Sequence, residues 1–216
     1  GHAGVEASIA ISNLGIKAFL VSMDQRAIGR MSWNPAIGGL GKGHLVKEID
    51  AMGGIMGRAA DFCGLQYKTL NTSKGRAVWS PRAQIDKKLY AQYIQKVVSS
   101  HKNILVVQDE VVDFYLDSYG IYSVKLLGGK TLEAQGMVVC SGTFLNGLIH
   151  IGKECFSAGR FGERPSSYLT DALKRKGVRF ARLKTGTPPR LLSSTINWDN
   201  LSTAPGDDSF TPFSIL

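Results

Sequence analysis

The sequence predicts an α/β fold, and the order of its apolar stretches carries that prediction. Small and apolar residues recur at helical spacing from residue 3 to residue 14, and the run 16–21 then reads as a buried strand. Pro81 is tolerated in a first helical turn, and one apolar stripe follows it to residue 98. Residues 104–108 read as a second buried strand, with alternating strands after it. Helix and strand therefore alternate before an antiparallel meander begins.

The first residues resemble half of a dinucleotide-binding fingerprint. Gly1 and Gly4 fit the second and third glycines of G-x-G-x-x-G, where the second lets the backbone approach a pyrophosphate and the third lets the helix pack on the sheet. A glycine pair that only serves packing is the alternative. The first glycine and its strand do not precede Gly1, so we expect a fragment. The acid that usually binds the ribose is replaced by Ser22, with Asp24 two residues on, and either could serve.

A glycine-rich loop at residues 34–43 precedes a short helix predicted over 44–52. It resembles a P-loop, but Ala36 and Gly43 stand where that motif needs glycine and a hydroxyl residue, so ATPase or GTPase chemistry is not expected. Glycine lets backbone N–H groups come close to an anion or a flat ring. A turn-rich connector is the plain alternative. The following segment 61–80 has no clean period and is expected to be irregular.

The second half of the chain predicts a meander and a returning strand. Residues 111–116 and 121–127 alternate around a D-S-Y-G turn, 131–134 continue them, and 137–141 read as a buried strand that stops at Gly142 and Thr143. This order is typical of the FAD-binding half of flavoproteins with two dinucleotide-binding domains. A helix capped by Ser166 and Ser167 and a strand from residue 178 follow.

Composition bounds the partners and the compartment. The chain has 216 residues and a formal charge of +9, and residues 153–190 hold ten Lys or Arg against three Asp or Glu. This basic segment favours a polyanionic partner or is a solvated face, and charge alone leaves both open. The three cysteines have no metal or C-x-x-C spacing, so we expect a reducing compartment. No apolar run is long enough to span a bilayer.

Several blocks together resemble one family, the MnmG/GidA tRNA uridine 5-carboxymethylaminomethyl modification enzymes. These blocks are G-H-A-G (1–4), N-P-A-I-G-G-L-G-K-G-H-L-V-K-E-I-D (34–50), L-N-T-S-K-G-R-A-V (70–78), P-R-A-Q (81–84), S-G-T-F-L-N-G-L-I-H-I-G (141–152), G-R-F-G-E-R-P-S (159–166) and R-L-K-T-G-T-P-P-R (182–190). The match runs in order along nearly the whole chain and covers about the N-terminal third of a family member.

The resemblance implies a cytoplasmic, homodimeric flavoenzyme. Members bind FAD, use NADH and methylenetetrahydrofolate as co-substrates, and act with the GTPase partner MnmE on the wobble uridine of certain tRNAs. It implies a glutathione-reductase-type, Rossmann-like FAD-binding domain over 1–180, lacking its first strand, and the start of an inserted second domain over 181–216. The flavin would carry the difficult step and the protein would position it.

The resemblance also assigns residues. For FAD it implies that Gly1, His2, Ala3 and Gly4 form the pyrophosphate loop, that the backbone of Val111 contacts the adenine, and that Ser166 makes a further contact. It also implies that Gly142 and Thr143 form the turn beside the flavin, and that the flavin ring is lined by a loop with Asn34, Pro35, Gly38, Gly39 and Lys42. For tRNA phosphates it implies Arg182, Lys184 and Arg190, whose contacts would weaken steeply with salt. No metal site is expected.

One position departs from the family pattern. Trp33 stands where the family usually has a cysteine, and an indole cannot replace a thiolate nucleophile, so the catalytic residue stays unassigned. Either the thiol is not essential, or the chain is impaired at this position. Because the glycines that should precede Gly1 and the later regions of a family member are also absent, we expect the 216-residue chain not to turn over. The related folate- and FAD-dependent tRNA (uracil-5-)-methyltransferase is the nearest rival, and a non-catalytic nucleic-acid-binding module on a dinucleotide fold is another.

Overall fold

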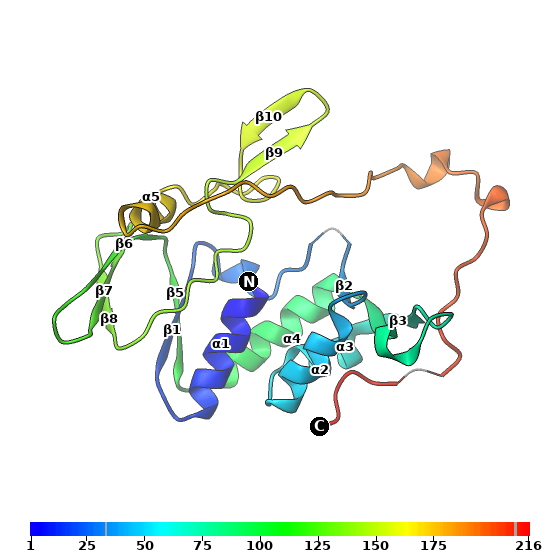
Figure 1. Ribbon diagram of the computed structural model, residues 1–216, viewed down its shortest axis with the longest axis horizontal. Helices are drawn as coiled ribbons and strands as arrows, with labels where there is room; N and C mark the ends of the chain where they lie inside the picture. The colour runs from blue at the N-terminus through cyan, green and yellow to red at the C-terminus, as the bar shows by residue number, and fades with distance from the viewer. Residues whose placement is uncertain (33, 210) are drawn as a thin grey trace. The chain divides into compact units, whose positions relative to one another are not determined.

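The chain folds into two compact units, each built from two separate stretches of sequence (Figure 1). The computed structural model describes residues 1–32, 34–209 and 211–216. Unit 1 holds residues 1–30 and 91–180, and unit 2 holds residues 31–90 and 181–216. The chain passes from one unit to the other after residues 30, 90 and 180, and the expected division into domains 1–180 and 181–216 stays a prediction.

Unit 1 combines a parallel strand pair with an antiparallel meander. Helix α1 (His2–Asn13) leads to β1 (Ala18–Ser22) and the short 3₁₀ helix η1 (Gln25–Ala27). Strand β1 pairs in parallel with β5 (Ile104–Gln108), with Ala18 opposite Ile104. The meander is β6 (Val111–Leu116), β7 (Tyr122–Leu126) and β8 (Thr131–Ala134), in that spatial order. The mixed α/β class and the meander are thus confirmed.

A small apolar core fixes helix α5 (Tyr168–Arg175) on the meander. Phe114, Val124 and Leu126 of the meander are buried together with Ala172 of the helix. The Asp113 carboxylate also accepts a 2.8 Å hydrogen bond from the Arg175 guanidinium. The helix is therefore held against the first strand of the meander.

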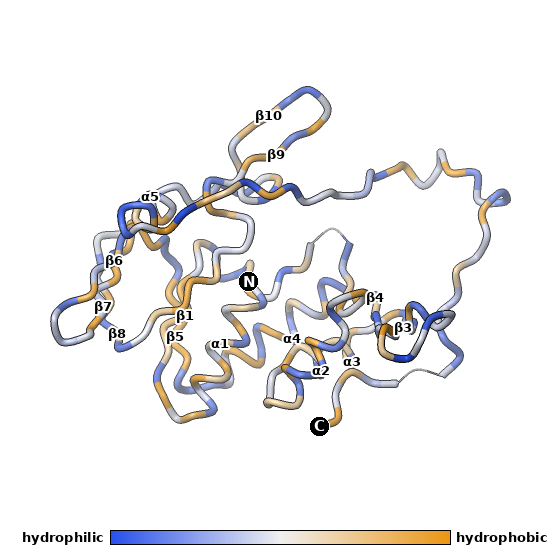
Figure 2. Tube along the Cα trace, in the orientation of Figure 1, coloured by the Kyte–Doolittle hydropathy of each residue, from blue (hydrophilic) through white to orange (hydrophobic). Residues whose placement is uncertain are grey.

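Two predicted strands of unit 1 do not form, and two others form but are less buried than predicted. Residues 137–141, and those from 178 onward, form no strand among the described residues, because no neighbouring strand there offers them a ladder. Strands β1 and β5 form as predicted but are not fully buried: Phe19 is 45% and Leu105 50% exposed. Figure 2 shows both strands as apolar. A hairpin of β9 (Leu148–Ile151) and β10 (Glu154–Ser157) was not predicted.

Unit 2 is a three-stranded antiparallel sheet covered by two short helices. The strands β2 (Ala36–Gly38), β4 (Ser80–Ile85) and β3 (Gly64–Leu70) lie in that order. The helices are α2 (Gly43–Ala51) and α3 (Met56–Cys63), and η2 spans Arg76–Val78. The prediction of a helix over 44–52 is confirmed within a residue at each end. The prediction of an irregular stretch over 61–80 is wrong in part, because it contains the end of α3 and all of β3.

The prediction that Pro81 opens a helix is also wrong. Pro81 lies in the central strand β4, opposite Thr69 of β3. Strand β2 already ends at Gly38, opposite Arg82, so the ladder on that side needs no N–H from residue 81. Helix α4 (Lys87–Ser100) begins later, where the Asp86 carboxylate accepts the N–H groups of residues 88 and 89 at 2.9 and 3.0 Å.

The last residues of the chain bind along unit 2 as an extended segment, here called the C-terminal strap (204–209 and 211–216). The Asp61 carboxylate accepts the backbone N–H groups of Phe213 and Ser214 at 2.9 and 2.8 Å, and Asp50 accepts that of Ile215 at 2.9 Å. The Phe213 side chain is only 1% exposed. Between α5 and the strap, the helical turns η3 (Ser193–Thr195) and η4 (Trp198–Asn200) interrupt an extended, exposed run.

Within the described residues, the longest helices are too short or too polar to traverse a lipid bilayer.

Candidate functional site

Unit 1 contains a cavity of about 1300 Å³ that runs along one face of α1, from Gly1 to Ile11, and along the whole of β1. The first residue of the meander, residues 132–141 and several residues between 160 and 169 also line it. Of the predicted cofactor residues, the lining includes Gly1, Gly4, Val111 and Ser166. Both candidates for the ribose, Ser22 and Asp24, also line it. The cavity therefore brings together residues that are up to 165 positions apart in the sequence.

The start of α1 presents backbone donors to this cavity. Gly1 is the N-cap of the 12-residue helix, and no side chain caps it. The first N–H groups of a helix lack intrahelical acceptors, and their partial positive charge favours an anion. A Cβ on Gly1 would meet no described atom within 4 Å, whereas one on Gly4 would lie 3.5 Å from Cys140 and Leu20, an ordinary contact. A side chain at position 4 would therefore meet only ordinary contacts, so Gly4 is not sterically required there.

Charged side chains surround the end of β1, and apart from Asp24 the sequence analysis did not single them out. The Arg30 guanidinium bridges Asp24 at 3.2 Å and Glu163 at 2.8 Å, and Arg160 lies 3.6 Å from Glu163. Hydrogen bonding from the Arg26 backbone N–H is the main cause that lowers the pKa of Asp24. Glu110, only 4% exposed, pairs with Arg164 at 3.2 Å. Sequence could not group these residues, because 133 positions separate Arg30 from Glu163.

Ser166 joins the loop before the β9–β10 hairpin to helix α5. Its N–H donates to Phe144 O at 2.8 Å, and its carbonyl accepts the Thr170 hydroxyl at 3.0 Å. The side chain of Ser167, the N-cap of α5, makes no capping hydrogen bond. The predicted capping role of this serine pair is therefore wrong for the Ser167 side chain. Ser166 is 6% exposed and keeps its place in the cavity wall.

Four other predicted residues of unit 1 and its loops lie outside the cavity lining. His2 and Ala3 belong to the first turn of α1 but are not among the lining residues. Gly142 adopts φ 55°, and the Thr143 hydroxyl donates to Gly159 O at 2.8 Å. The turn at 142–143 therefore has a local structural task in the loop that precedes β9.

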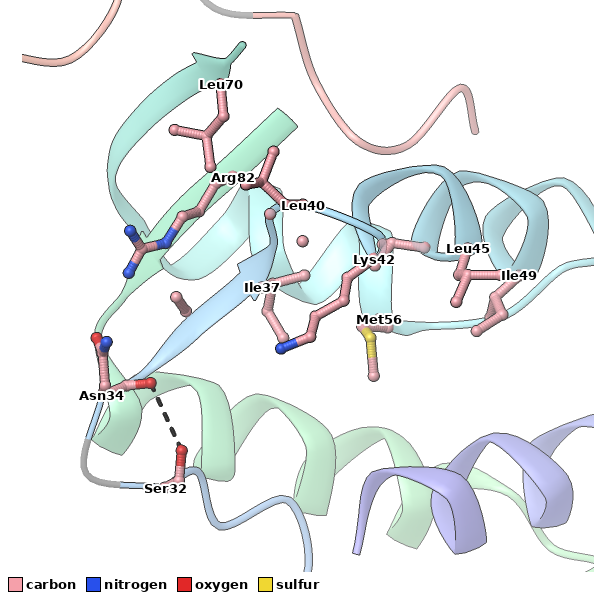
Figure 3. Close-up of a pocket in the computed structure, with 14 residues that line it drawn as sticks. Ser32, Asn34, Ile37, Leu40, Lys42, Leu45, Ile49, Met56, Leu70 and Arg82 are labelled. Carbon is pink, nitrogen blue, oxygen red and sulfur yellow. Dashed lines mark hydrogen bonds between the residues drawn. The ribbon is translucent and has the colours of Figure 1, made fainter. Parts of the chain in front are cut away.

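Unit 2 contains a second pocket, of about 610 Å³, in which the glycine-rich loop forms one wall (Figure 3). Asn34, Gly38, Gly39 and Lys42 line it, as does Arg82 of β4. Apolar side chains make up most of the rest: Ile37, Leu40, Leu45, Val46, Ile49, Met56 and Leu70. Pro35 does not line the pocket; its carbonyl accepts the Ile85 N–H at 2.8 Å and so joins the loop to β4. Trp33, the family's cysteine position, lies outside the described residues.

The loop approaches β4 so closely that glycine is required. The Gly39 N–H donates to Pro81 O at 2.8 Å. A Cβ on Gly38, which has φ 77°, would collide with Pro81 O and the Phe213 ring, and one on Gly43 would lie 2.7 Å from Pro81 O. These contacts hold the loop wall of the pocket in place, and the C-terminal strap supports it from behind through Phe213.

The three residues predicted to contact tRNA do not line either cavity. Arg182, Lys184 and Arg190 lie in the exposed segment 178–192, which has no helix or strand. A basic, extended and exposed segment can reach a polyanion, but it does not by itself define a binding geometry.

Comparison with known proteins identifies the family. The family described as glucose inhibited division protein A (GIDA) matches residues 1–216. The chain belongs to this GidA family. It is similar to the tRNA uridine 5-carboxymethylaminomethyl modification enzymes MnmG of Thermodesulfovibrio yellowstonii, at 45% identity, and of Aquifex aeolicus, at 46%. Both alignments cover 99% of this chain and 34% and 35% of the relatives. The chain thus spans about a third of their length.

Solved structures agree with the family. The chain is similar to Aquifex aeolicus GidA in its form II crystal, with a TM-score of 0.93 and 46% identity over 99% of this chain and 36% of that one. A GidA-related protein from Thermus thermophilus, at 17% identity and a TM-score of 0.55, shares the fold over 84% of this chain and 67% of that one. The mixed α/β architecture described above is therefore that of GidA.

We expect substitution of Gly38 to damage unit 2 far more than substitution of Gly41. Gly38 and Gly41 both have positive φ, 77° and 68°, so alanine costs each about 1–2 kcal/mol of backbone strain. Only at Gly38 would the new Cβ also collide with Pro81 O and Phe213, which adds about 1–3 kcal/mol of overpacking. Urea denaturation of Gly38→Ala, with Gly41→Ala as the control, measures the difference. Equal losses would show that the close approach to Pro81 does not matter.

We expect the stability of unit 1 to depend on pH through His2. Burial is the main cause that lowers the pKa of His2 below 6.5, and the Arg160 guanidinium lowers it further. Between the folded and unfolded pKa the unfolded chain binds more protons, so this contribution to stability decreases as pH falls through 6.5. The urea midpoint should drop less between pH 7.5 and 5.5 in His2→Gln than in the wild type. His44→Gln, at an exposed position of α2, should behave like the wild type.

Proposed function

We propose that this chain is the FAD-binding part of an enzyme that modifies the wobble uridine of tRNA. The name of its relatives at 45–46% identity supports tRNA uridine modification. The arrangement of unit 1, a parallel pair with α1 on it and a meander after it, supports a Rossmann-like, glutathione-reductase-type domain. Because the chain spans a third of those relatives, activity, substrates and partners of the whole enzyme are part of this proposal.

The observation that carries the proposal is the cavity at the start of α1. Its volume of about 1300 Å³ exceeds the roughly 300–1,000 Å³ of pockets for drug-sized ligands, as a dinucleotide requires. Donors for a pyrophosphate are the first N–H groups of α1 and the guanidinium groups of Arg30, Arg160 and Arg164. The residues present therefore fit the ADP portion of FAD.

Named roles follow within that cavity. Gly1 to Gly4 would hold the pyrophosphate, Val111 the adenine through its backbone, and Ser166 a further part of the dinucleotide. Ser22 can offer its hydroxyl to the ribose, but that hydroxyl already donates to Asp24 O at 2.9 Å. The Asp24 carboxylate is shared between Arg26 and Arg30. Both remain candidates for the ribose.

The rest of the proposed reaction depends on groups from other molecules. FAD would supply the redox chemistry, with NADH as reductant and methylenetetrahydrofolate as one-carbon source. The roles at the flavin ring expected for Asn34, Pro35, Gly38, Gly39, Lys42, Gly142 and Thr143 stay part of this proposal. MnmE as GTPase partner, a homodimer and a cytoplasmic location complete the proposal. Trp33 replaces the family's cysteine, so no nucleophile is assigned.

A titration of the 216-residue chain with FAD tests the cavity. We expect saturable but weak binding, because residues 137–141 form no ladder with β1 and leave that wall of the cavity unsupported. Gly4→Trp should abolish the binding, since Gly4 lines the cavity, whereas Ala10→Trp on the exposed face of the same helix should retain it. Quenching of flavin fluorescence measures both, and circular dichroism checks that α1 is intact.

Two outcomes would count against the FAD proposal. One is that FAD does not bind the wild-type chain at millimolar concentration. The other is that both tryptophan variants bind FAD equally, which would place the ligand elsewhere. Binding at sub-micromolar concentration would instead contradict only the expectation of weak binding.

The predicted tRNA contact has its own test. Each phosphate neutralised by a cation steepens the dependence of affinity on salt, so Lys184→Gln should weaken tRNA binding and reduce the slope of log K against log salt by about one. Filter binding between 50 and 200 mM salt measures the slope. Lys88→Gln, at an exposed position in α4, is the control and should leave the slope unchanged. An unchanged slope for Lys184→Gln would remove this residue from the proposed interface.

A further inference from the structure

The C-terminal strap is tied to three elements of unit 2 by hydrogen bonds. Near its start, the Asp207 carboxylate accepts the Thr69 N–H of β3 at 2.8 Å. Further along, the Lys47 ammonium of α2 donates to Pro212 O at 3.1 Å. Near its end, the Asp61 carboxylate of α3 accepts two consecutive N–H groups of the strap at 2.9 and 2.8 Å. The strap is therefore held by polar contacts, in several of which its own backbone is the partner.

One side chain of the strap meets the glycine-rich loop in the interior of unit 2. Phe213 is 1% exposed, whereas the other described residues of the strap are exposed or half-buried. Its ring fills the space beside Gly38, where a Cβ would lie 2.7 Å from the ring. Protein interiors are close-packed, so departure of the ring would leave a void directly beside the loop. The position of Phe213 and the conformation of the loop therefore depend on each other.

A buried carboxylate opposes the binding of the strap. Asp50 is fully buried; its Oδ2 accepts the Ile215 N–H of the strap, but its Oδ1 has no hydrogen-bond donor within the described part of the chain. A Cβ on Gly57 of α3 would lie 2.9 Å from this Oδ1, so α3 covers the oxygen closely. A carboxylate oxygen without a donor is unfavourable in the interior, because water would otherwise solvate it. This cost offsets part of the gain from burying Phe213 and brings the bound and released states of the strap closer in free energy.

We propose that the C-terminal strap is a reversible latch on the glycine-rich loop. In the bound state, Phe213 holds Gly38 against Pro81. In the released state, the strap leaves Asp50 and Asp61, water solvates both carboxylates, and the loop separates from β4 while the β3–β4 ladder persists. The inference goes beyond the proposed function, because it concerns the conformation of unit 2 and needs no FAD.

The latch connects a largely exposed run of the chain to a pocket wall. Residues 181–203 precede the strap and are almost all exposed, and the loop forms one wall of the pocket in unit 2. Binding of the strap and closure of the loop favour each other, so their coupling is reciprocal. A rearrangement of residues 181–203 that draws the strap away therefore opens the loop and changes the shape of the pocket.

The first test perturbs the strap and measures the loop, by hydrogen exchange of the full 216-residue chain followed by NMR. Asp61→Asn replaces one of the two acceptor oxygens of the strap by a donor. We expect the Gly39 amide, which donates to Pro81 O, to exchange about tenfold faster, while the amides of the β3–β4 ladder keep their rates. Ile215→Ala, at a side chain of the same strap that is 79% exposed, is the matched control and should leave the Gly39 rate unchanged.

The second test perturbs the loop and measures the strap. Gly38→Ala places a Cβ against the Phe213 ring, so the amides of Phe213 and Ser214 should exchange roughly tenfold faster. Gly41→Ala also substitutes a glycine with positive φ, but its Cβ would meet nothing within 4 Å, so the strap amides should keep their rates. Phe213→Leu should retain most of the protection at Gly39 that Phe213→Ala loses, because leucine still fills the space beside the loop.

Three results would overturn the latch. Exchange that accelerates equally at Gly39 and in the β3–β4 ladder would show that the strap is a fixed part of the fold. An unchanged Gly39 rate in Asp61→Asn, or equal effects of Gly38→Ala and Gly41→Ala on the strap, would show that strap and loop are not coupled. If Gly38→Ala does not fold, the Asp61→Asn and Phe213→Leu measurements decide. None of these measurements involves FAD, so failure of the proposed function would leave the latch standing.

Discussion

The backbone contact between the glycine-rich loop and Pro81 is the constraint on which the arrangement of unit 2 depends. The Gly39 N–H donates to Pro81 O, and neither Gly38 nor Gly43 has room for a Cβ beside that carbonyl. The backbone of the loop therefore lies in direct contact with the central strand β4. Lys42, at the end of the loop, and Arg82, on the central strand β4, consequently line the same pocket of unit 2. A larger residue at either glycine would push the loop away and separate the two cations.

Sequence reasoning recovered the features that depend on local pattern. The apolar alternation of 111–127 predicted the meander, and helical spacing predicted α1. Both predictions succeeded because the apolar face of each element is formed by residues close together in the sequence. It failed where the partner lies elsewhere in the chain. Residues 137–141 have the composition of a strand but no ladder among the described residues, and Pro81 looked like a helix start because the sequence does not show that β2 ends before it. Strand and ladder are properties of pairs, which composition cannot reveal.

The residues of the candidate sites also fall into two groups, those that a sequence motif marks and those that only the structure brings together. Glycines at 1, 4, 38 and 39 were predicted because a motif marks them, and the structure places all four on cavity walls. The charged groups of those walls had no such signal. The Arg30 guanidinium contacts the Glu163 carboxylate although 133 positions separate them in the sequence, and Arg82 lies between Gly38 and Lys68 only because the sheet places it there. A charged residue becomes a candidate only when its neighbours in space are known, so the chemistry of both pockets had to come from the structure.

The C-terminal strap has a consequence for how the chain is made. Asp50 and Asp61 receive the backbone of residues 213–215 from more than 150 positions away, and Phe213 completes the interior beside the glycine-rich loop. During synthesis from the N-terminus, residues 31–90 must therefore leave the ribosome long before the segment that closes their core. The Asp50 and Asp61 carboxylates lack these backbone partners until that segment emerges. Unit 2 can finish folding only after residues 213–215 have emerged, so its core closes well after the strands of its sheet are free to pair.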